Sequence, residues 1–165
     1  RDDPLLTCRL EGGRNPRRII IDSNAFLPLR SRILNTIHES EIIVAVNKNA
    51  QQGRIEKLEQ LGCTIIQTRD KSDRVDLKDL FRKLGKMKLT NILVEGGSRV
   101  ITSIIEERLA DKVIVFIAPI IIGGEEAQSP ILGKGVDTVD KAMKINEITV
   151  KSFSHDIAIE GILEC

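Results

Sequence analysis

Two adjacent glycines between an apolar run and a helical pattern are the residues of this sequence best suited to bind a ligand. Asn91–Val94 predicts a strand, Glu95-Gly96-Gly97-Ser98 a turn, and the periodicity after Gly97 a helix. Glycines let a ligand approach the backbone, and a helix start offers unpaired N–H groups and the positive end of the helix dipole, which suits phosphate. A tight turn with a surface glutamate explains this motif equally well, and the Gly-x-Gly-x-x-Gly fingerprint is absent.

Two further segments carry side chains that suit a phosphorylated ligand. Asp2 and Asp3 precede a rigid proline, and Arg9 follows within the same segment with a planar fork that matches phosphate geometry. Asp22-Ser23 closes the first predicted strand, so Ser23 can reach a phosphate or a ribose hydroxyl. A solvated loop and a simple turn remain alternative explanations for these segments on local grounds.

Histidine and cysteine do not form a recognisable reactive or metal-binding pattern. His38 and His155 lie at no recognisable spacing from a partner carboxylate, so neither is assigned a catalytic role. Cys8, Cys63 and Cys165 are far apart and odd in number, which favours idle thiols in a reducing cytosol over a disulfide framework or a metal cluster. We therefore expect a cytoplasmic protein without a metal site.

The composition excludes several classes of partner. The 165 residues include 25 basic and 24 acidic side chains, so the net charge of +1 gives no electrostatic basis for binding nucleic acid or an anionic membrane. Aromatic residues make up 2% of the chain, without Trp or Tyr, which leaves no base-stacking surface. No apolar run approaches the ~20 residues of a membrane span.

Strands and helices alternate along the first two-thirds of the sequence, which predicts one α/β domain with a mostly parallel sheet. Helices are expected around Ile55–Leu61, from an Asp76 cap to Leu84, and after Gly97. The predicted strands cover residues 18–23, 41–47, 63–68, 91–94 and 112–118, followed by a hairpin of 144–153 and 156–163. Residues 24–40 are expected to form a loop with one helical turn. The glycine-rich stretch from Gly123 to Gly135 is either a lid over a ligand or a plain surface loop.

Taken together, four ordered motifs resemble one known family. They are Asp2-Asp3-Pro4-Leu5-Leu6-Thr7-Cys8-Arg9, Pro16-Arg17-Arg18-Ile19-Ile20-Ile21-Asp22-Ser23, Val94-Glu95-Gly96-Gly97, and Val115-Phe116-Ile117-Ala118-Pro119 with Gly123-Gly124 behind it. The series resembles the reductase domain of the bacterial bifunctional riboflavin-biosynthesis deaminase-reductase. The resemblance implies a dihydrofolate-reductase-like three-layer α/β/α fold, with a mostly parallel mixed sheet and a C-terminal antiparallel hairpin.

The resemblance also implies an activity and a set of binding residues. The reaction would be NADPH-dependent reduction of the ribosyl group of 5-amino-6-(5-phosphoribosylamino)uracil to a ribityl chain. The substrate would contact Leu6, Arg9 and Glu95, with Arg9 next to the 5′-phosphate. No catalytic residue is assigned. The residues expected to contact NADPH are Asp2, Ser23, Gly97, Ser98, Arg99, Val100, Ile101, Thr102 and Ser103.

The sequence departs from the family at its beginning. The family's opening strand, with an Ala-x-Ser-x-Asp-Gly-like motif, and the Trp-Ile-Thr-like segment after it are missing. We expect a reductase domain over residues 1–165 that is incomplete at its N-terminus, with unpaired edges where the strand belongs. A homodimer and an upstream deaminase domain are the partners that the resemblance implies. The alternatives are another reductase of this fold, such as one acting on a pterin, and a non-catalytic nucleotide-binding remnant.

Overall fold

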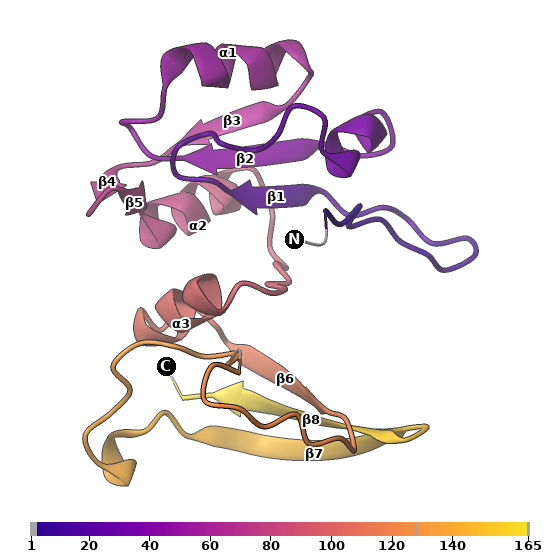
Figure 1. Cartoon of the computed structure of the whole chain (residues 1–165), viewed down its shortest axis with the longest axis vertical. Coiled ribbons are helices and arrows are strands. Elements are labelled where there is room, and N and C mark those ends of the chain that lie inside the picture. The colour runs from indigo at the N-terminus through magenta and orange to yellow at the C-terminus, as the bar shows by residue number, and fades with distance from the viewer. Residues whose placement is uncertain (1–2, 128, 165) are drawn as a thin grey trace. The chain divides into compact units, whose positions relative to one another are not determined.

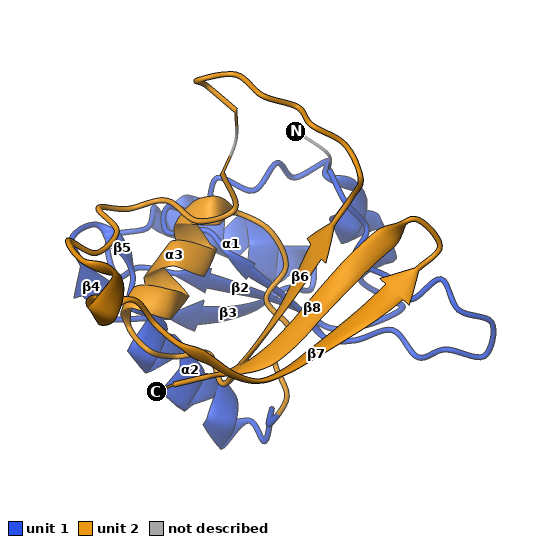
Figure 2. Ribbon diagram, turned by 90° about the horizontal axis from the view of Figure 1, so that it is seen from below, with its two compact units in different colours: residues 1–90 blue, residues 91–165 orange. Residues whose placement is uncertain are grey.

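The chain forms two compact units, residues 1–90 and 91–165, drawn in different colours in Figure 2. A computed structural model describes residues 3–127 and 129–164. Each unit contains its own three-stranded sheet, and a separate two-stranded ladder belongs to unit 1. The sequence predicts a single domain, and that remains a prediction.

Unit 1 is built on a parallel sheet. β1 (Arg18–Ile21), β2 (Ile42–Val46) and β3 (Thr64–Gln67) lie in the order β1-β2-β3, with β2 in the centre. All five residues of β2 are buried, because the strand is covered on both faces. This is the arrangement that a continuous Ile/Val run predicts, since alternate side chains point to opposite faces.

Helices cover the two faces of this sheet (Figure 1). On one face, α1 (Gln52–Gln60) and the short helix η1 (Arg32–Thr36) pack on alternate residues of β2. On the other face lies α2 (Leu77–Lys86), which begins at the expected cap: the Asp76 carboxylate accepts a hydrogen bond from the Asp79 N–H at 3.0 Å. The core cluster on the α1 side consists of Ala25, Ile33, Leu34, Ile42, Val44, Val46, Ile55, Leu58 and Cys63.

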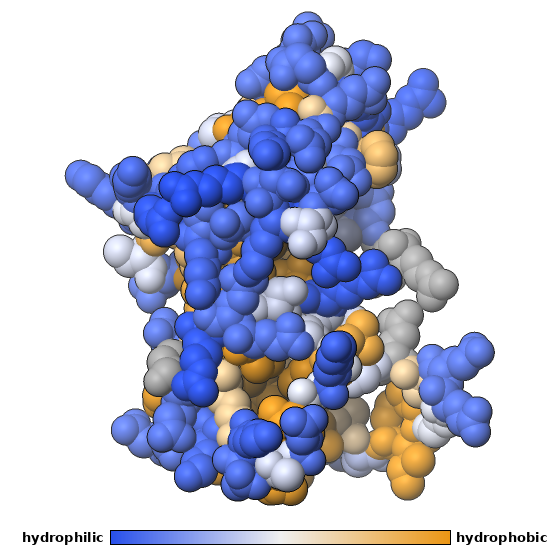
Figure 3. Space-filling model, turned by 90° about the vertical axis from the view of Figure 1, so that its left-hand side faces the viewer, coloured by the Kyte–Doolittle hydropathy of each residue, from blue (hydrophilic) through white to orange (hydrophobic). Residues whose placement is uncertain are grey.

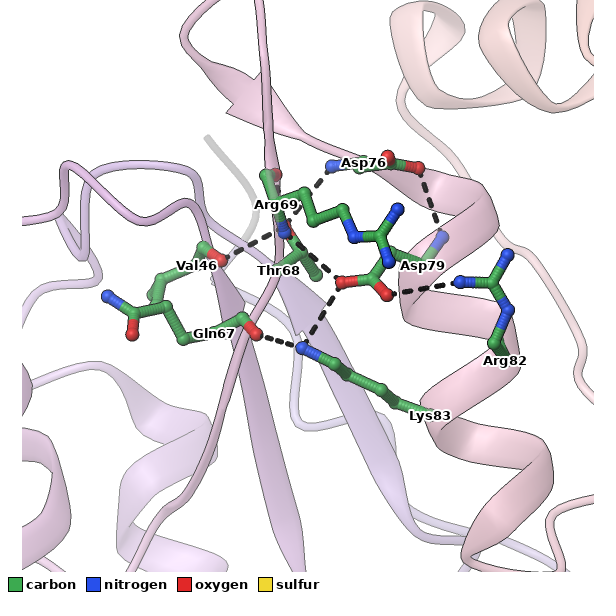
Figure 4. Close-up of polar contacts among 8 residues, drawn as sticks. All are labelled: Val46, Gln67, Thr68, Arg69, Asp76, Asp79, Arg82 and Lys83. Carbon is green, nitrogen blue, oxygen red and sulfur yellow. Dashed lines mark hydrogen bonds and ion pairs between the residues drawn. The ribbon is translucent and has the colours of Figure 1, made fainter.

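A buried carboxylate ties the end of β3 to α2 (Figure 4). Asp79 is 5% exposed, and its side chain accepts a hydrogen bond from the Arg69 N–H at 3.1 Å and pairs with Lys83 at 3.1 Å. Burial raises the pKa of this carboxyl, but the Arg69 N–H and the Lys83 ammonium outweigh it and hold the pKa below its usual value. The Thr68 hydroxyl accepts from the Asp76 N–H at 3.2 Å, so the turn into α2 is fixed on both sides.

Unit 2 combines one helix with an antiparallel sheet. α3 (Ser98–Glu106) precedes β6 (Lys112–Ile117), and the sheet order is β6-β8-β7, with β7 (Ile145–Phe153) and β8 (Asp156–Leu163) joined by the expected two-residue turn. A long connection with one short helix, η2 (Val139–Lys141), links β6 to β7. Of the buried hydrophobic residues, unit 2 contributes Ile104, Ala158 and Leu163, so most of the described core belongs to unit 1.

Two features differ from the sequence-based expectations. Asn91–Val94 forms no strand: these residues pair with no described strand, and Leu93 is 76% exposed. An apolar run predicts an extended backbone, but a strand also needs a neighbour that supplies hydrogen bonds. The structure adds a short antiparallel ladder, β4 (Asp70–Lys71) and β5 (Arg74–Val75), whose two-residue strands are too short to carry a detectable pattern.

Candidate functional site

The turn that begins α3 has the backbone geometry that the sequence motif predicts. Gly96 and Gly97 have φ angles of +61° and +79°, a region that residues with a Cβ rarely adopt. Gly97 is the N-cap of α3, and no side chain caps the helix. The first N–H groups of α3 are therefore not engaged by a capping side chain, and they lie at the positive end of the helix dipole.

A cavity of about 690 Å³ opens beside this helix start. The turn and first helical turn form one wall through Gly97, Ser98 and Ile101, and the long connection after β6 forms the other. Figure 2 shows this connection passing beside α3. The lining residues from the connection are Glu126, Ala127, Ser129, Pro130 and Leu132.

Thr102 joins the two walls of the cavity. Its hydroxyl donates to the Ser98 carbonyl and accepts from the Leu132 N–H, both at 2.7 Å. The close approach continues at Gly133, where an added Cβ would lie 2.6 Å from Glu106 Oε1 and 3.0 Å from Thr102 Cγ2. Thr102 is buried and both hydrogen-bonding functions of its hydroxyl are used, so the side chain shapes the cavity.

The other residues expected along the cofactor differ in exposure. Arg99 is exposed, whereas Val100, Ile101 and Ser103 are half-buried on α3. Glu95, expected to contact substrate, is exposed at the start of the same turn and makes no hydrogen bond or ion pair with the described residues. Of the candidates in unit 2, the structure brings Gly97, Ser98 and Ile101 together at the cavity with the long connection. The residues that are not among its lining are Glu95, Arg99, Val100, Thr102 and Ser103.

The remaining candidates belong to unit 1. Leu6 has a φ of +53° and Arg9 is exposed, in a segment without regular secondary structure. Ser23 lies at the carboxyl end of β1 as predicted, and its hydroxyl oxygen accepts a hydrogen bond from the Val75 N–H at 3.1 Å. Asp2 lies outside the described residues.

Sequence reasoning identified the helix start, but it left the glycine-rich stretch as either a lid or a plain loop and did not single out the residues that form the opposite wall of the cavity. Pro130 and Leu132 lie about 30 positions after the glycine turn in an aperiodic segment, and the only signal for them is the glycine-rich composition of residues 123–135. Among the described residues, no group of three or more His, Cys, Asp or Glu side chains is arranged to hold a metal ion. No helix in the described part of the chain has the length and apolarity needed to cross a membrane.

A comparison of this sequence with known protein families shows which family the chain belongs to. Residues 1–159 match the RibD C-terminal domain family. The chain belongs to this family. Among its relatives, the riboflavin biosynthesis protein RibD of Actinobacillus pleuropneumoniae is 32% identical over 98% of this chain and 43% of its own length. The chain therefore spans less than half the length of that RibD.

Other comparisons extend the similarity to a shorter enzyme and to solved structures. The 2,5-diamino-6-ribosylamino-4(3H)-pyrimidinone 5′-phosphate reductase of Methanothermobacter thermautotrophicus is 32% identical over 96% of this chain and 73% of its own length. Acinetobacter baumannii RibD superposes with a TM-score of 0.80 at 22% identity, covering 99% of this chain and 44% of that one. Yeast Rib7 gives 0.72 at 19% identity, covering 99% and 70%. These likenesses confirm the predicted dihydrofolate-reductase-like fold of this RibD-family chain.

Proposed function

We propose that this chain is an NADPH-dependent reductase of riboflavin biosynthesis that converts the ribosyl group of 5-amino-6-(5-phosphoribosylamino)uracil to a ribityl chain. The observation that carries the proposal is the uncapped helix start at Gly97, which lines a cavity in a member of the RibD C-terminal domain family. NADPH held by the Gly97–Ser103 segment would supply a hydride to C1′ of the sugar and become oxidised, with cleavage of the C1′–O4′ bond and protonation of O4′.

The residues around the start of α3 fit a dinucleotide. Bare backbone at Gly96 and Gly97 permits close approach, and the N–H groups of Ser98 and Arg99 can donate to pyrophosphate oxygens. The half-buried Ile101 and the exposed Leu132 would pack on apolar parts of the cofactor. We propose that Gly97–Ser103 holds NADPH, with Asp2 and Ser23 as further cofactor contacts.

On the substrate side, Arg9 is an exposed cation without an ion-pair partner among the described residues. Its planar fork suits the 5′-phosphate, and Leu6 in the same segment would contact the substrate. Glu95 is an exposed carboxylate, and we propose that it bonds ribose hydroxyls or helps to move a proton as the sugar ring opens.

The test has two stages. NADPH is first titrated against the protein, and absorbance at the wavelength of the reduced nicotinamide is then followed after adding the phosphorylated substrate. We expect saturable binding followed by substrate-dependent oxidation. Binding without oxidation would favour a non-catalytic nucleotide-binding remnant. Absence of NADPH binding would reject both the reductase and the remnant hypotheses. A parallel assay with dihydropterin tests the other reductase of this fold.

The similarity to the Methanothermobacter reductase, whose name specifies a 2,5-diaminopyrimidinone, supports a second candidate substrate. The two candidates share the phosphorylated sugar and differ at C2 of the pyrimidine, which carries an oxo group in one and an amino group in the other. Comparing kcat/KM for both compounds decides between them. We expect preference for the uracil, and a higher kcat/KM for the diamino compound would reverse the assignment.

We also propose a homodimer and a cytoplasmic location. Unit 2 exposes apolar side chains of its sheet to solvent, and Phe116 and Phe153 are 65% and 53% exposed although their ring centroids lie 6.1 Å apart. Figure 3 shows hydrophobic side chains at the surface in the part of the view that unit 2 occupies. Free thiols at Cys8 and Cys63 fit a reducing compartment. Sedimentation analysis across a concentration series tests the dimer.

A further inference from the structure

The segment that carries Leu6 and Arg9 needs external support to keep its conformation. Residues 3–9 contain no helix or strand, and Asp3 and Leu6 have φ angles of +38° and +53°. Residues with a Cβ rarely adopt this left-handed region, so such positions persist only where the surroundings fix them.

Three contacts from the rest of unit 1 supply this support. Both carboxylate oxygens of Asp3 accept from the Arg32 N–H at 3.1 Å, at the start of η1. The Cys8 N–H donates to Asn15 Oδ1 at 2.8 Å. Between these two ties, Arg18 Nη1 donates to the Leu5 carbonyl at 3.4 Å.

Arg18 is an unusual residue to find in this position. It is 2% exposed at the start of β1, and it forms no ion pair with any described carboxylate. Instead its fork donates to Thr36 Oγ1 at 2.5 Å, to the Thr36 carbonyl at 2.8 Å and to the Ser40 carbonyl at 2.5 Å, in addition to Leu5.

A buried cation surrounded by carbonyl groups is costly to desolvate, and burial lowers the pKa of Arg18 although the charge of Glu39 opposes that shift. An apolar side chain would be sufficient to fill a core position at the start of a strand. The guanidinium additionally links three segments, because its fixed donors reach η1, the Ser40 turn and the Leu5 segment at once.

We propose that Arg18 is a positioning residue that fastens the Leu5 carbonyl to η1 and so presents Leu6 and Arg9 to the substrate. The inference rests on the proposed function, since those two residues are its substrate contacts. The bond to Leu5 is the longest of the four at 3.4 Å, so its loss should have an effect at the low end of the range for hydrogen bonds from a charged donor. The expected weakening of substrate binding is about tenfold.

The test compares Arg18→Lys with the neighbouring Arg17→Lys as a matched control. Arg17 is exposed and its guanidinium pairs with Glu41 at 3.2 Å, away from the Leu5 segment. Lysine keeps the charge but cannot span three acceptors. We expect Arg18→Lys to raise the KM for the phosphorylated substrate about tenfold and to leave the Kd for NADPH within about twofold, while Arg17→Lys changes neither.

A second readout does not depend on activity. Within residues 5–9 of the described structure, the N–H of Cys8 is the one with a hydrogen-bond acceptor, Asn15 Oδ1. Hydrogen exchange at this amide in the free protein should accelerate in Arg18→Lys but not in Arg17→Lys. If Arg18→Lys does not fold, Thr36→Val removes one partner of the guanidinium and should give the same two signatures at smaller size. Unchanged exchange at the Cys8 amide together with an unchanged KM in an active enzyme overturns the inference. An inactive wild-type protein instead overturns the proposed function, and the exchange result then stands alone.

Discussion

The Thr102 hydroxyl accepts the backbone N–H of Leu132 at 2.7 Å, so a loop residue 30 positions further along the chain is fixed against α3. The same hydroxyl donates to the Ser98 carbonyl one helical turn earlier. These two hydrogen bonds to backbone groups hold the two walls of the cavity together within unit 2. The long connection after β6 is therefore anchored beside the glycine turn at this point.

Thr102→Val should loosen the loop while conserving side-chain volume. It leaves the Leu132 N–H without its acceptor, so we expect a loss of about 1 kcal/mol of unfolding free energy and a several-fold weaker Kd for NADPH. Thr102→Ser retains the hydroxyl and serves as the control. Calorimetric titration measures the Kd for NADPH in both variants. Equal NADPH affinity in Thr102→Val and Thr102→Ser would contradict a role for the loop in the site.

Gly97→Ala should weaken cofactor binding because of backbone strain and occupied space in the turn. Its φ of +79° penalises any Cβ, and the nearest atom to such a Cβ, Val100 Cγ2, lies 3.9 Å away, so strain rather than a clash is the cost to the free protein. We expect about 1 kcal/mol of destabilisation and at least a tenfold rise in the Kd for NADPH.

Gly85→Ala provides the control for that substitution. Gly85 lies within α2 with an ordinary helical backbone, and no heavy atom lies within 4 Å of an added Cβ. We expect a gain of about 0.5–1 kcal/mol in thermal unfolding experiments and unchanged NADPH binding. A Gly97→Ala protein that binds NADPH as tightly as Gly85→Ala would remove the glycine turn from the cofactor site.

Arg9→Ala should act on the phosphate of the substrate alone. With no protein partner among the described residues, its loss costs little stability, but the KM for the phosphorylated substrate should rise tenfold or more. Arg14→Ala removes another exposed arginine of the same region and should leave the KM unchanged. For the dephosphorylated substrate, wild type and Arg9→Ala should have similar kcat/KM; a large difference there would show that Arg9 does not bind the phosphate.

Asp79→Asn should change the acid limb of the stability profile. The pKa of Asp79 is lowered in the folded protein by the Arg69 N–H and Lys83 despite burial, so the carboxylate stabilises the fold above its unfolded pKa of about 3.9. This stabilisation is lost as the pH falls through the lower, folded pKa. At pH 7 we expect the variant to be about 1–3 kcal/mol less stable, with the difference shrinking in acid.

Urea unfolding between pH 2.5 and 7 measures that profile. Glu59→Gln on α1 is the control, since its exposed side chain has no hydrogen bond or ion pair within the described residues and its removal should leave the profile unchanged. A constant difference between wild type and Asp79→Asn across the whole range would mean that the Asp79 charge does not contribute.

Local patterns were enough to predict most of the fold. The Ile/Val runs predicted β1, β2 and β3, and the Asp76 cap predicted the start of α2, because burial and capping are recorded in consecutive residues. The prediction of a strand at Asn91–Val94 was wrong because the apolar pattern does not reveal whether a neighbouring strand is present. The ladder of β4 and β5 escaped notice because two-residue strands have no periodicity.

The candidate site was predictable only where one segment carries it. Gly96-Gly97-Ser98 combines turn, helix start and ligand chemistry in consecutive residues, and the structure confirms the turn and the helix start. Thr102 and Leu132 form a pair through a backbone N–H, which every residue except proline possesses. Likewise Arg18 contacts the backbone carbonyl of Leu5 and not its side chain, so the residue type at position 5 gives no sign of this hydrogen bond.

The uneven distribution of buried hydrophobic residues has a consequence for the way the chain melts. With Ile104, Ala158 and Leu163 as its only buried hydrophobic residues among those described, unit 2 has little to hold it together by cooperative packing. Heating should therefore produce two separate transitions, with β6, β7 and β8 losing amide protection first. A dinucleotide bound at α3 would stabilise unit 2 by mass action, so it should raise the midpoint temperature of the first transition and leave that of the second unchanged.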